Sequence, residues 1–297
     1  MGESARKTIA VQGIDVPRLL YGTAWKEERT AELVGAALDA GFRGIDTANQ
    51  RRHYHEAAVG EAITGAIGRG VVRRDELFLQ TKFTYVEGQD ARLPYDPEAD
   101  HTTQVWQSFR SSLEHLGVER IDAFLLHGPR SRRGLSEADL EVWRTMEDLQ
   151  REGGARLIGV SNVTAGQLAE LCGIAEVPPA LVQNRCFARL GWDREVRAVC
   201  REKGVVYQGF SLLTANLTEL SSPTILRLAA GHGKTAAQIA FRFAIQLGMI
   251  CLTGTTDPRH MRDDLDVFDF ELSEGEIAAI EGSGLAGTAR PSASGTR

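Results

Sequence analysis

Polar side chains that can take part in proton transfer stand at the ends of several apolar, strand-like runs of the sequence. Asp46 closes a short run that begins at Gly44, Lys82 comes near the end of the next run, and His127 directly follows residues 121–126. An acid and a lysine that close neighbouring buried strands are costly to place there unless they form an ion pair. A carboxylate, an amine and an imidazole at corresponding places therefore indicate acid–base chemistry at one site.

Three later strand-like runs also end in polar residues, here amides and hydroxyls rather than charged groups. They are Ser161 with Asn162, Gln183 with Asn184, and Ser211. Such groups donate and accept hydrogen bonds without titrating, which suits them to orient a small bound molecule beside the charged residues.

Eight apolar runs alternate with amphipathic, helix-like segments along nearly the whole chain. The predicted strands are residues 19–23, 44–47, 77–83, 121–126, 157–161, 181–184, 205–210 and 249–252. The predicted helices are residues 30–40, 56–67, 105–116, 137–152, 165–173, 194–203, 236–247 and 273–280. Continuous apolar strands joined by helices indicate a parallel sheet covered on both faces. Eight such units without a linker predict an α/β fold, a single (β/α)8 TIM barrel domain over residues 1–297 whose site lies at the carboxyl ends of the strands.

The segments outside this alternation are short. Residues 8–12 and a second run from Val16 predict an N-terminal β-hairpin. A doubly wound sheet is the main competitor, but its GxGxxG turn after the first strand is absent and Gly22-Thr23-Ala24-Trp25 stands there. Residues 83–100 predict a long loop over the barrel mouth, and residues 282–297 predict a mobile tail.

Composition argues against several classes of function. The net charge is −6 and no long run of Lys and Arg occurs, so neither a nucleic-acid partner nor a membrane surface is expected. No signal-peptide-like or membrane-spanning apolar stretch is seen, which favours a cytoplasmic location. The four cysteines lack CxxC spacing and predict buried free thiols.

In these residues the sequence resembles the aldo-keto reductase family along nearly its whole length. The motifs that carry the resemblance are Gly41-Phe-Arg-Gly-Ile-Asp-Thr-Ala48, Tyr54 with Glu56 and Gly60, Leu79-Gln-Thr-Lys82, Ile121-Asp122 leading to His127, Ile158-Gly-Val-Ser-Asn162 and Val182-Gln-Asn184. The strings His53-Tyr54-His55-Glu56, Gly88-Gln-Asp90, Pro94-Tyr-Asp96, Thr253-Gly-Thr-Thr256 and His260-Met261 are similar to a subgroup common in fungi. Each string alone is weak, whereas their shared order along the chain is specific.

The resemblance implies a hydride transfer from a reduced nicotinamide cofactor to an aldehyde, ketone or dicarbonyl, with Tyr54 as proton donor. Lys82 would favour the phenolate form of Tyr54, and Asp46 would hold Lys82 charged and in place. His127 would hydrogen-bond the carbonyl oxygen and orient the substrate.

The position of the tyrosine leaves an alternative open. The family has fewer residues between its aspartate and tyrosine, so that counting back from Gly60 places His53 at the familiar position, whereas the subgroup's HYxE string favours Tyr54. His53 and His55 also form an HxH pair typical of metal sites, but no third ligand with suitable spacing follows, so no metal is expected.

The resemblance also implies a dinucleotide site built from many parts of the chain. Ser161, Asn162 and Gln183 would bind the nicotinamide carboxamide and Phe210 would stack on its ring. The residues expected along the ribose, phosphates and adenine are Thr23, Ser211, Leu213, Gly254, Thr255, Thr256, His260 and Asp264. Gly254 and His260 stand where the family has a lysine and an arginine that grip the 2′-phosphate, although Arg259 or Arg262 can compensate. NADP(H) is the expected cofactor, with NAD(H) or dual use as the alternative.

Trp25, Tyr85 and Trp192 are the predicted walls of the substrate pocket, which favours a small apolar or aromatic carbonyl compound bound by a monomer. Two other functions remain open. One is a nicotinamide-binding regulatory subunit or redox sensor with little turnover, and the other is a metal-dependent barrel hydrolase that uses the HxH pair.

Overall fold

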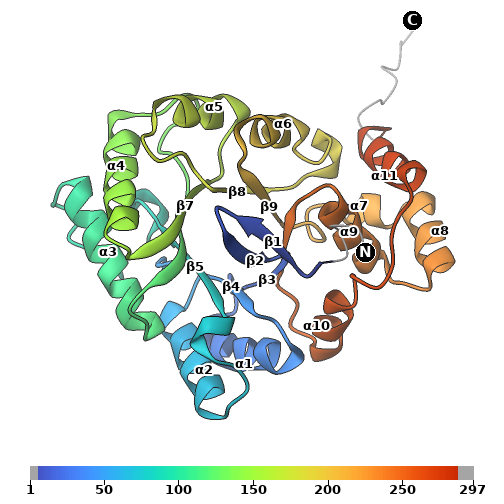
Figure 1. The fold of residues 1–297 in the computed structure, drawn as a ribbon, viewed down its shortest axis with the longest axis horizontal. Helices are drawn as coiled ribbons and strands as arrows, with labels where there is room; N and C mark the ends of the chain where they lie inside the picture. Colours follow the sequence, from blue (N-terminus) through green and yellow to red (C-terminus); the bar gives the residue numbers. More distant parts are fainter. Residues whose placement is uncertain (1–5, 287–297) are drawn as a thin grey trace, which may run out of the picture.

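The computed structural model describes residues 6–286, in which eight parallel strands close into a barrel surrounded by helices (Figure 1). The strands of the barrel are β3 (Leu19–Gly22), β4 (Gly44–Asp46), β5 (Phe78–Phe83), β6 (Ile121–Leu126), β7 (Ala155–Ser161), β8 (Leu181–Arg185), β9 (Val206–Phe210) and β10 (Ile250–Thr253). Each strand pairs with its neighbours in chain order, and β10 pairs with β3 to close the ring. The predicted TIM barrel is therefore confirmed.

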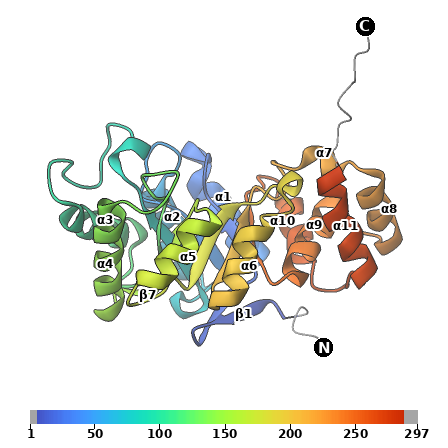
Figure 2. The same cartoon turned by 90° about the horizontal axis from the view of Figure 1, so that it is seen from above.

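The predicted N-terminal hairpin is confirmed as β1 (Thr8–Val11) and β2 (Ile14–Pro17). Its two-residue turn places Gln12 at φ 48° and Gly13 at φ 79°, the left-handed conformation that tight hairpin turns require. Val11 and Val16 pack with apolar side chains of the barrel interior, including Leu20. The hairpin thus closes the amino end of the barrel, and the loop that follows β5 lies at the opposite end (Figure 2).

Several of the helices that cover the barrel begin at a side-chain cap. Ser136, Thr164 and Thr235 each accept a hydrogen bond from the third helical backbone N–H in a capping box. The helices are α1 (Thr30–Ala40), α2 (Glu56–Gly68), α3 (His101–Leu116), α4 (Glu137–Arg151), α5 (Ala165–Ile174), α6 (Arg194–Lys203), α7 (Leu217–Leu220), α8 (Pro223–His232), α9 (Ala236–Gln246), α10 (Pro258–Leu265) and α11 (Glu274–Ala286). The 3-10 turns within residues 6–286 are η2 (Glu27–Arg29), η3 (Arg74–Glu76), η4 (Val86–Gly88) and η5 (Ala188–Leu190). None of the described helices is long and apolar enough to cross a membrane.

Two predicted features differ from the structure near the carboxyl end. The last helix continues to Ala286 instead of ending at residue 280, so the predicted tail is wrong for residues 282–286, and its remainder lies outside the described residues. Between β9 and α9 the sequence predicted no helix, yet α8 begins there with Ser222 as its cap and Pro223 in its first turn. Proline is tolerated in the first turn because its missing N–H would have no helical partner there.

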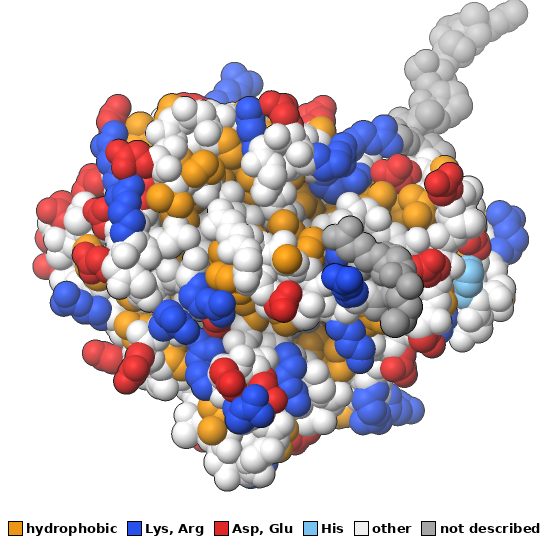
Figure 3. All heavy atoms as spheres, in the orientation of Figure 1, with side chains coloured by type: hydrophobic (Ala, Val, Ile, Leu, Met, Phe, Trp, Pro, Cys, Tyr) orange, Lys and Arg blue, Asp and Glu red, His pale blue; other side chains and the backbone are white. Residues whose placement is uncertain are grey.

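Apolar residues form one core between the helices and the barrel and a second inside the barrel. On the face that carries the hairpin, basic and acidic side chains are interspersed (Figure 3).

The four cysteines are free thiols, and burial raises the pKa of Cys186 to about 12. Toward the carboxyl ends of the strands the interior becomes polar, and the candidate site begins at this layer.

Candidate active site

The Asp46 carboxylate and the Lys82 ammonium form a buried ion pair between adjacent strands. Lys82 Nζ lies 2.7 Å from Asp46 Oδ1 and 2.8 Å from Oδ2, and it also donates to the backbone oxygen of Thr47 at 2.8 Å. Both residues are almost fully buried. Burial lowers the pKa of Lys82, and Asp46 opposes that shift by stabilising the ammonium. Such a pair stabilises the fold only because its remaining hydrogen bonds are satisfied.

Two glutamines, Gln80 and Gln183, donate hydrogen bonds to Asp46, and a third, Gln208, bonds both of them. Gln80 Nε2 donates to Asp46 Oδ1 at 2.6 Å and Gln183 Nε2 at 2.9 Å, while Gln80 and Gln208 bond each other at 2.8 Å in both directions. The sequence analysis missed Gln80 and Gln208. The period of two along a strand was the available signal, since Gln80 shares a face with Lys82 and Gln208 with Phe210.

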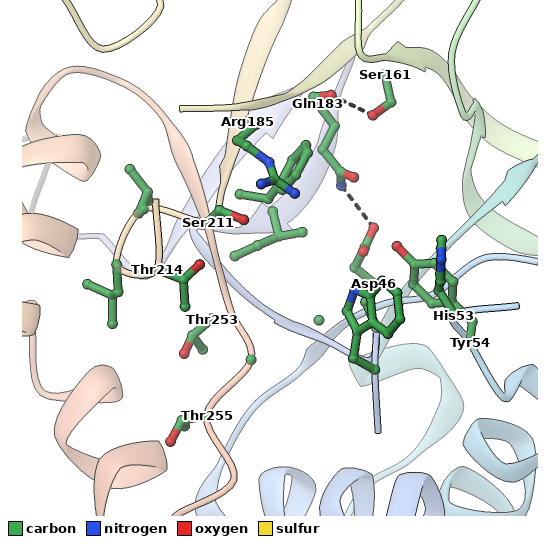
Figure 4. Close-up of a pocket in the computed structure, with 18 of the residues that line it drawn as sticks. Asp46, His53, Tyr54, Ser161, Gln183, Arg185, Ser211, Thr214, Thr253 and Thr255 are labelled. Atoms are coloured by element: carbon green, nitrogen blue, oxygen red, sulfur yellow. Dashed lines mark hydrogen bonds between the residues drawn. The ribbon is translucent and has the colours of Figure 1, made fainter. Parts of the chain in front are cut away.

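The loop between β4 and α2 brings both Tyr54 and His53 to the lining of the pocket, but in different places. The backbone oxygen of Gln50 accepts hydrogen bonds from the N–H groups of both residues, at 3.2 Å from His53 and 3.0 Å from Tyr54. The Tyr54 ring centre lies 5.3 Å from Lys82 Nζ and 5.9 Å from the ring of His127. Its hydroxyl points into the pocket on the side of Asp46 (Figure 4). Burial raises the pKa of Tyr54, and the nearby Asp46 charge adds to that rise, so the phenol is protonated at neutral pH.

His53 takes a different position, with its ring 4.0 Å from the exposed indole of Trp25. Its backbone oxygen accepts a hydrogen bond from Trp25 N–H at 2.7 Å. The structure therefore brings Tyr54, and not His53, beside the Asp46–Lys82 pair.

The anchor behind this loop is Glu56, the first residue of α2, which is buried. Its carboxylate accepts hydrogen bonds from the Thr81 hydroxyl and from His115 Nδ1, the latter at 3.1 Å. The hydrogen bond to Glu56 raises the pKa of His115. Because Thr81 precedes Lys82 in β5, this contact fixes the start of α2 against the strand that carries the lysine.

His127 is held as a neutral imidazole. Its Nδ1 lies 2.7 Å from Thr84 Oγ1, and its backbone oxygen accepts a hydrogen bond from Asn162 Nδ2 at 2.8 Å. Burial, with smaller contributions from the charges of Lys82 and His53, lowers the pKa of His127 to about 3. Thr84 is a further site residue that the sequence analysis did not identify.

A cavity of about 550 Å³ opens above this polar layer. Of the predicted cofactor residues, those that line it are Ser161, Asn162, Gln183, Phe210, Ser211, Leu213, Gly254 and Thr255. Gln183 uses its Nε2 for Asp46 and Gln208, which leaves its Oε1 as an acceptor. Three of the lining residues, Trp25, Asn162 and Ser211, have left-handed backbones with φ 61°, 56° and 56°. For residues with a Cβ this conformation is costly, and it is often found at functional sites.

Four predicted cofactor residues lie outside the lining of this cavity. Thr23 is buried and donates its hydroxyl to the backbone oxygen of Asp46 at 3.0 Å. Asp264 is buried and accepts from the Thr253 hydroxyl at 2.7 Å, and burial raises its pKa to about 6. Thr256 and His260 are exposed before and within the first turn of α10. The sequence placed all four beside the dinucleotide, whereas none of them lines the cavity.

Two cations of the cavity were not predicted. Lys26 is buried, its ammonium donates to the backbone oxygen of Gly254, and burial together with the charge of Arg29 lowers its pKa. A Cβ at position 254 would lie 3.5 Å from Lys26 Nζ, so the ammonium borders the space that a side chain at 254 would enter. Arg185, at the end of β8, is the other cation and points into the cavity (Figure 4).

The predicted substrate walls divide into three cases. Trp25 is 68% exposed and lines the cavity. Tyr85 lines a second cavity of about 510 Å³ that shares His127 and Asn162 with the first. The prediction for Trp192 is wrong, because this side chain is 1% exposed, packs 5.0 Å from the ring of Phe243 and lines neither cavity.

The geometry of His53 and His55 gives no support to the metal alternative. Among residues 6–286, no group of three or more His, Cys, Asp or Glu side chains is arranged to hold a metal ion.

Comparison with known proteins agrees with the motifs. The model of the aldo/keto reductase family matches residues 19–284. The chain is 34% identical over 275 residues to an aldo-keto reductase of Mycolicibacterium vanbaalenii, covering 93% of this chain and 88% of the relative. It is 35% identical to the D-galacturonate reductase of Fragaria ananassa, covering 81% and 77%. A solved structure of a Bombyx mori aldo-keto reductase in complex with NADP matches with a TM-score of 0.79 at 28% identity, covering 93% and 92%.

Proposed function

The chain belongs to the aldo-keto reductase family, and from this premise we propose that Tyr54 donates the proton in its reduction of a small aldehyde, ketone or dicarbonyl. Family membership makes it an NAD(P)H-dependent oxidoreductase that acts on carbonyl groups. The observation that carries the proposal is the position of the Tyr54 ring, whose centre is 5.3 Å from a lysine ammonium that is itself paired with Asp46.

The pocket fits a nicotinamide dinucleotide. The Phe210 ring offers a flat face for a nicotinamide ring, and Gln183 Oε1 and the Asn162 amide suit its carboxamide. Lys26 supplies positive charge at the Gly254 end of the pocket, and the one carboxylate among the lining residues, Asp46, is neutralised by Lys82. The bound reduced cofactor supplies the hydride for the carbonyl carbon.

Tyr54 would provide the proton as that hydride arrives. The proton moves from Tyr54 Oη to the carbonyl oxygen, where negative charge develops, and leaves a phenolate. The Lys82 ammonium favours that phenolate by direct charge attraction, and this offsets the rise in the Tyr54 pKa caused by burial. Asp46 keeps Lys82 protonated and in place, so its role is indirect.

His127 would position the substrate oxygen. An imidazole whose pKa is lowered to about 3 is neutral and has one N–H to donate. When the Thr84 hydroxyl donates a hydrogen bond to Nδ1 of His127, the single N–H of the imidazole is on Nε2. Nε2 is then the donor for the substrate carbonyl. A neutral donor orients the carbonyl without competing with Tyr54 for proton transfer.

We propose NADP(H) as the preferred cofactor. Lys26, the exposed Arg259 and the hydroxyls of Thr255 and Thr256 all lie near the start of α10, where a phosphate is favoured. The relatives solved with NADPH or NADP support this choice. NAD(H) remains the alternative, since Gly254 carries no cation.

All residues of the proposed site come from one chain, which supports activity as a monomer. The cytoplasmic location stays a prediction from the sequence.

The test is a side-by-side titration of the purified protein with NADPH and NADH, followed by a panel of aldehydes, ketones and dicarbonyls. Quenching of tryptophan fluorescence reports binding, because Trp25 lines the pocket. We expect saturable binding that is tighter for NADPH, and consumption of the cofactor with several members of the panel. Binding without turnover across the panel would overturn the proposal and favour a regulatory role.

A further inference from the structure

Arg185 is a charged side chain in the pocket that the proposed reaction does not use. It ends β8, lines the cavity and is exposed to it. Within residues 6–286 its guanidinium takes part in no hydrogen bond or ion pair, and it lies beside two aromatic rings. The guanidinium carbon lies 5.4 Å from the ring centre of Phe210 and 5.9 Å from that of Phe187. A guanidinium is charged at every physiological pH.

The surroundings of Arg185 place it at one end of the pocket. Gln183 precedes it by two residues, so both side chains face the same side of β8. Figure 4 shows its guanidinium beside Ser211 and Gln183, whereas Thr255 lies at the other end of the pocket. Gln183 and Phe210 are the residues that fit a nicotinamide, so Arg185 lies at the nicotinamide end, and Lys26 lies at the end of Gly254 and Thr255.

No carboxylate compensates this charge. Asp46 is paired with Lys82, and the other lining residues include no further acid. A bound ligand would displace water from this cavity and lower its dielectric constant. A cation without a counter-ion there repels any positive charge close to it more strongly than it would in water.

The two redox forms of a nicotinamide cofactor differ in charge at one place. The oxidised ring is a cation and the reduced ring is neutral, while the ribose, phosphates and adenine are the same in both. A contact to the shared parts changes both affinities equally, whereas a charge beside the ring changes their ratio.

We propose that Arg185 makes the pocket select the reduced cofactor over the oxidised one by charge repulsion at the nicotinamide ring. The selection keeps the oxidised product cofactor from occupying the site and so favours operation as a reductase. This inference rests on the proposed function, because it requires a nicotinamide stacked at Phe210.

The test compares the parent protein with Arg185→Met and Arg185→Lys. Dissociation constants for NADPH, NADP⁺ and 2′-phospho-ADP-ribose are measured by calorimetry at one salt concentration. Met keeps much of the apolar stem without the charge, and Lys keeps the charge. The exposed position makes folding of both variants expected, and circular dichroism checks it.

We expect Arg185→Met to tighten NADP⁺ relative to NADPH by about fivefold to tenfold, the effect of one charge several ångströms away at intermediate dielectric. Arg185→Lys should keep most of the parent ratio, and 2′-phospho-ADP-ribose, which lacks the nicotinamide, should bind all three proteins alike. An equal loss of affinity for all three ligands would overturn the proposal and make Arg185 a phosphate contact. An unchanged ratio would overturn it while leaving the proposed function standing, and failure of the parent to bind either redox form would overturn both.

Discussion

The Lys82 ammonium lies 5.3 Å from the centre of the Tyr54 ring, although the two residues come from different strand ends and are 28 positions apart in the chain. The loop after β4 brings Tyr54 to Lys82, and the Gln50 backbone oxygen holds this loop by accepting a hydrogen bond from Tyr54 N–H. Asp46 holds Lys82 by an ion pair. This relationship makes the assignment of the proton donor testable by single substitutions.

Tyr54→Phe should lower kcat by about 10²- to 10⁴-fold, the usual contribution of a positioned general acid, with little change in the dissociation constant for the cofactor. The phenyl ring keeps the contacts to Lys82 and His127, so the fold should persist. Steady-state kinetics with a substrate from the carbonyl panel measures the effect. His53→Gln is the matched control and should keep kcat within a few-fold, because His53 faces Trp25. The reverse pattern would assign the proton donor to position 53.

Lys82→Met should destabilise the fold by about 3–5 kcal/mol, because it leaves the buried Asp46 carboxylate without its counter-ion. The double variant Asp46→Asn with Lys82→Met should recover part of that loss, since no buried charge remains. Urea unfolding at pH 7 gives the free energies, and both variants should lack reductase activity. Equal stability of the single and double variants would show that Gln80 and Gln183 alone satisfy Asp46.

We expect the free energy of unfolding to fall as the pH falls from about 6.5 to about 3, because His127 is buried as a neutral imidazole. The unfolded chain binds a proton on this side chain below its ordinary pKa of about 6.5, whereas the folded protein does not until about pH 3. The unfolding free energy therefore falls by up to about 1.4 kcal/mol per pH unit in this window. Subtracting the pH profile of His127→Gln from that of the parent isolates this contribution. A nuclear magnetic resonance titration of His127 with a midpoint near 6.5 would contradict the prediction.

Lys26→Met should weaken NADPH binding by about tenfold, as expected for the loss of one charge-assisted contact to phosphate. The Lys26 ammonium borders the space beside Gly254. No other lysine is among the pocket-lining residues, so none can replace its charge there. Fluorescence titration measures the change, and Lys203→Met on the outer surface of α6 is the control. Equal affinity in the Lys26 variant would place the phosphates elsewhere.

The fold was largely predictable because hydrophobic periodicity is local. Residues 121–126, 30–40 and 194–203 have the predicted bounds, since each is framed by turn residues or caps. The helix α8 was not among the predicted helices, although Ser222 followed by Pro223 is a typical start of a helix. The continuation of α11 past residue 280 was also missed, because glycines at 282 and 284 suggest an end, yet the helix runs through them.

The candidate site was only partly predictable, because a sequence pattern identifies strand ends but not which long side chains reach across the barrel. Asp46, Lys82 and His127 follow from strand ends alone. Lys26 and Arg185 come from positions without a motif, and only the three-dimensional arrangement shows that they border the cavity. The prediction for Trp192 was wrong for the opposite reason, since an aromatic residue in the connection from a strand to a helix serves equally well as core.

The helix α2 packs closely on α3, and this packing supports the loop that carries Tyr54. A Cβ added at Gly60 would lie 1.9 Å from the backbone oxygen of His115 and 2.8 Å from Leu116 Cα. Backbone atoms cannot rotate away, so the two helices would have to separate, and Glu56 would lose its 3.1 Å contact with His115.

We therefore expect Gly60→Ala to destabilise the fold by about 3 kcal/mol, the upper part of the range for overpacking. Gly68→Ala, in the same helix, has nothing within 4 Å of the added Cβ and should be neutral or stabilising by up to about 1 kcal/mol through helix propensity. Thermal and urea unfolding of the two variants side by side measure the difference. Equal stability would mean that α2 and α3 lie farther apart than this structure places them, and the support for the Tyr54 loop would have to come from Gln50 alone.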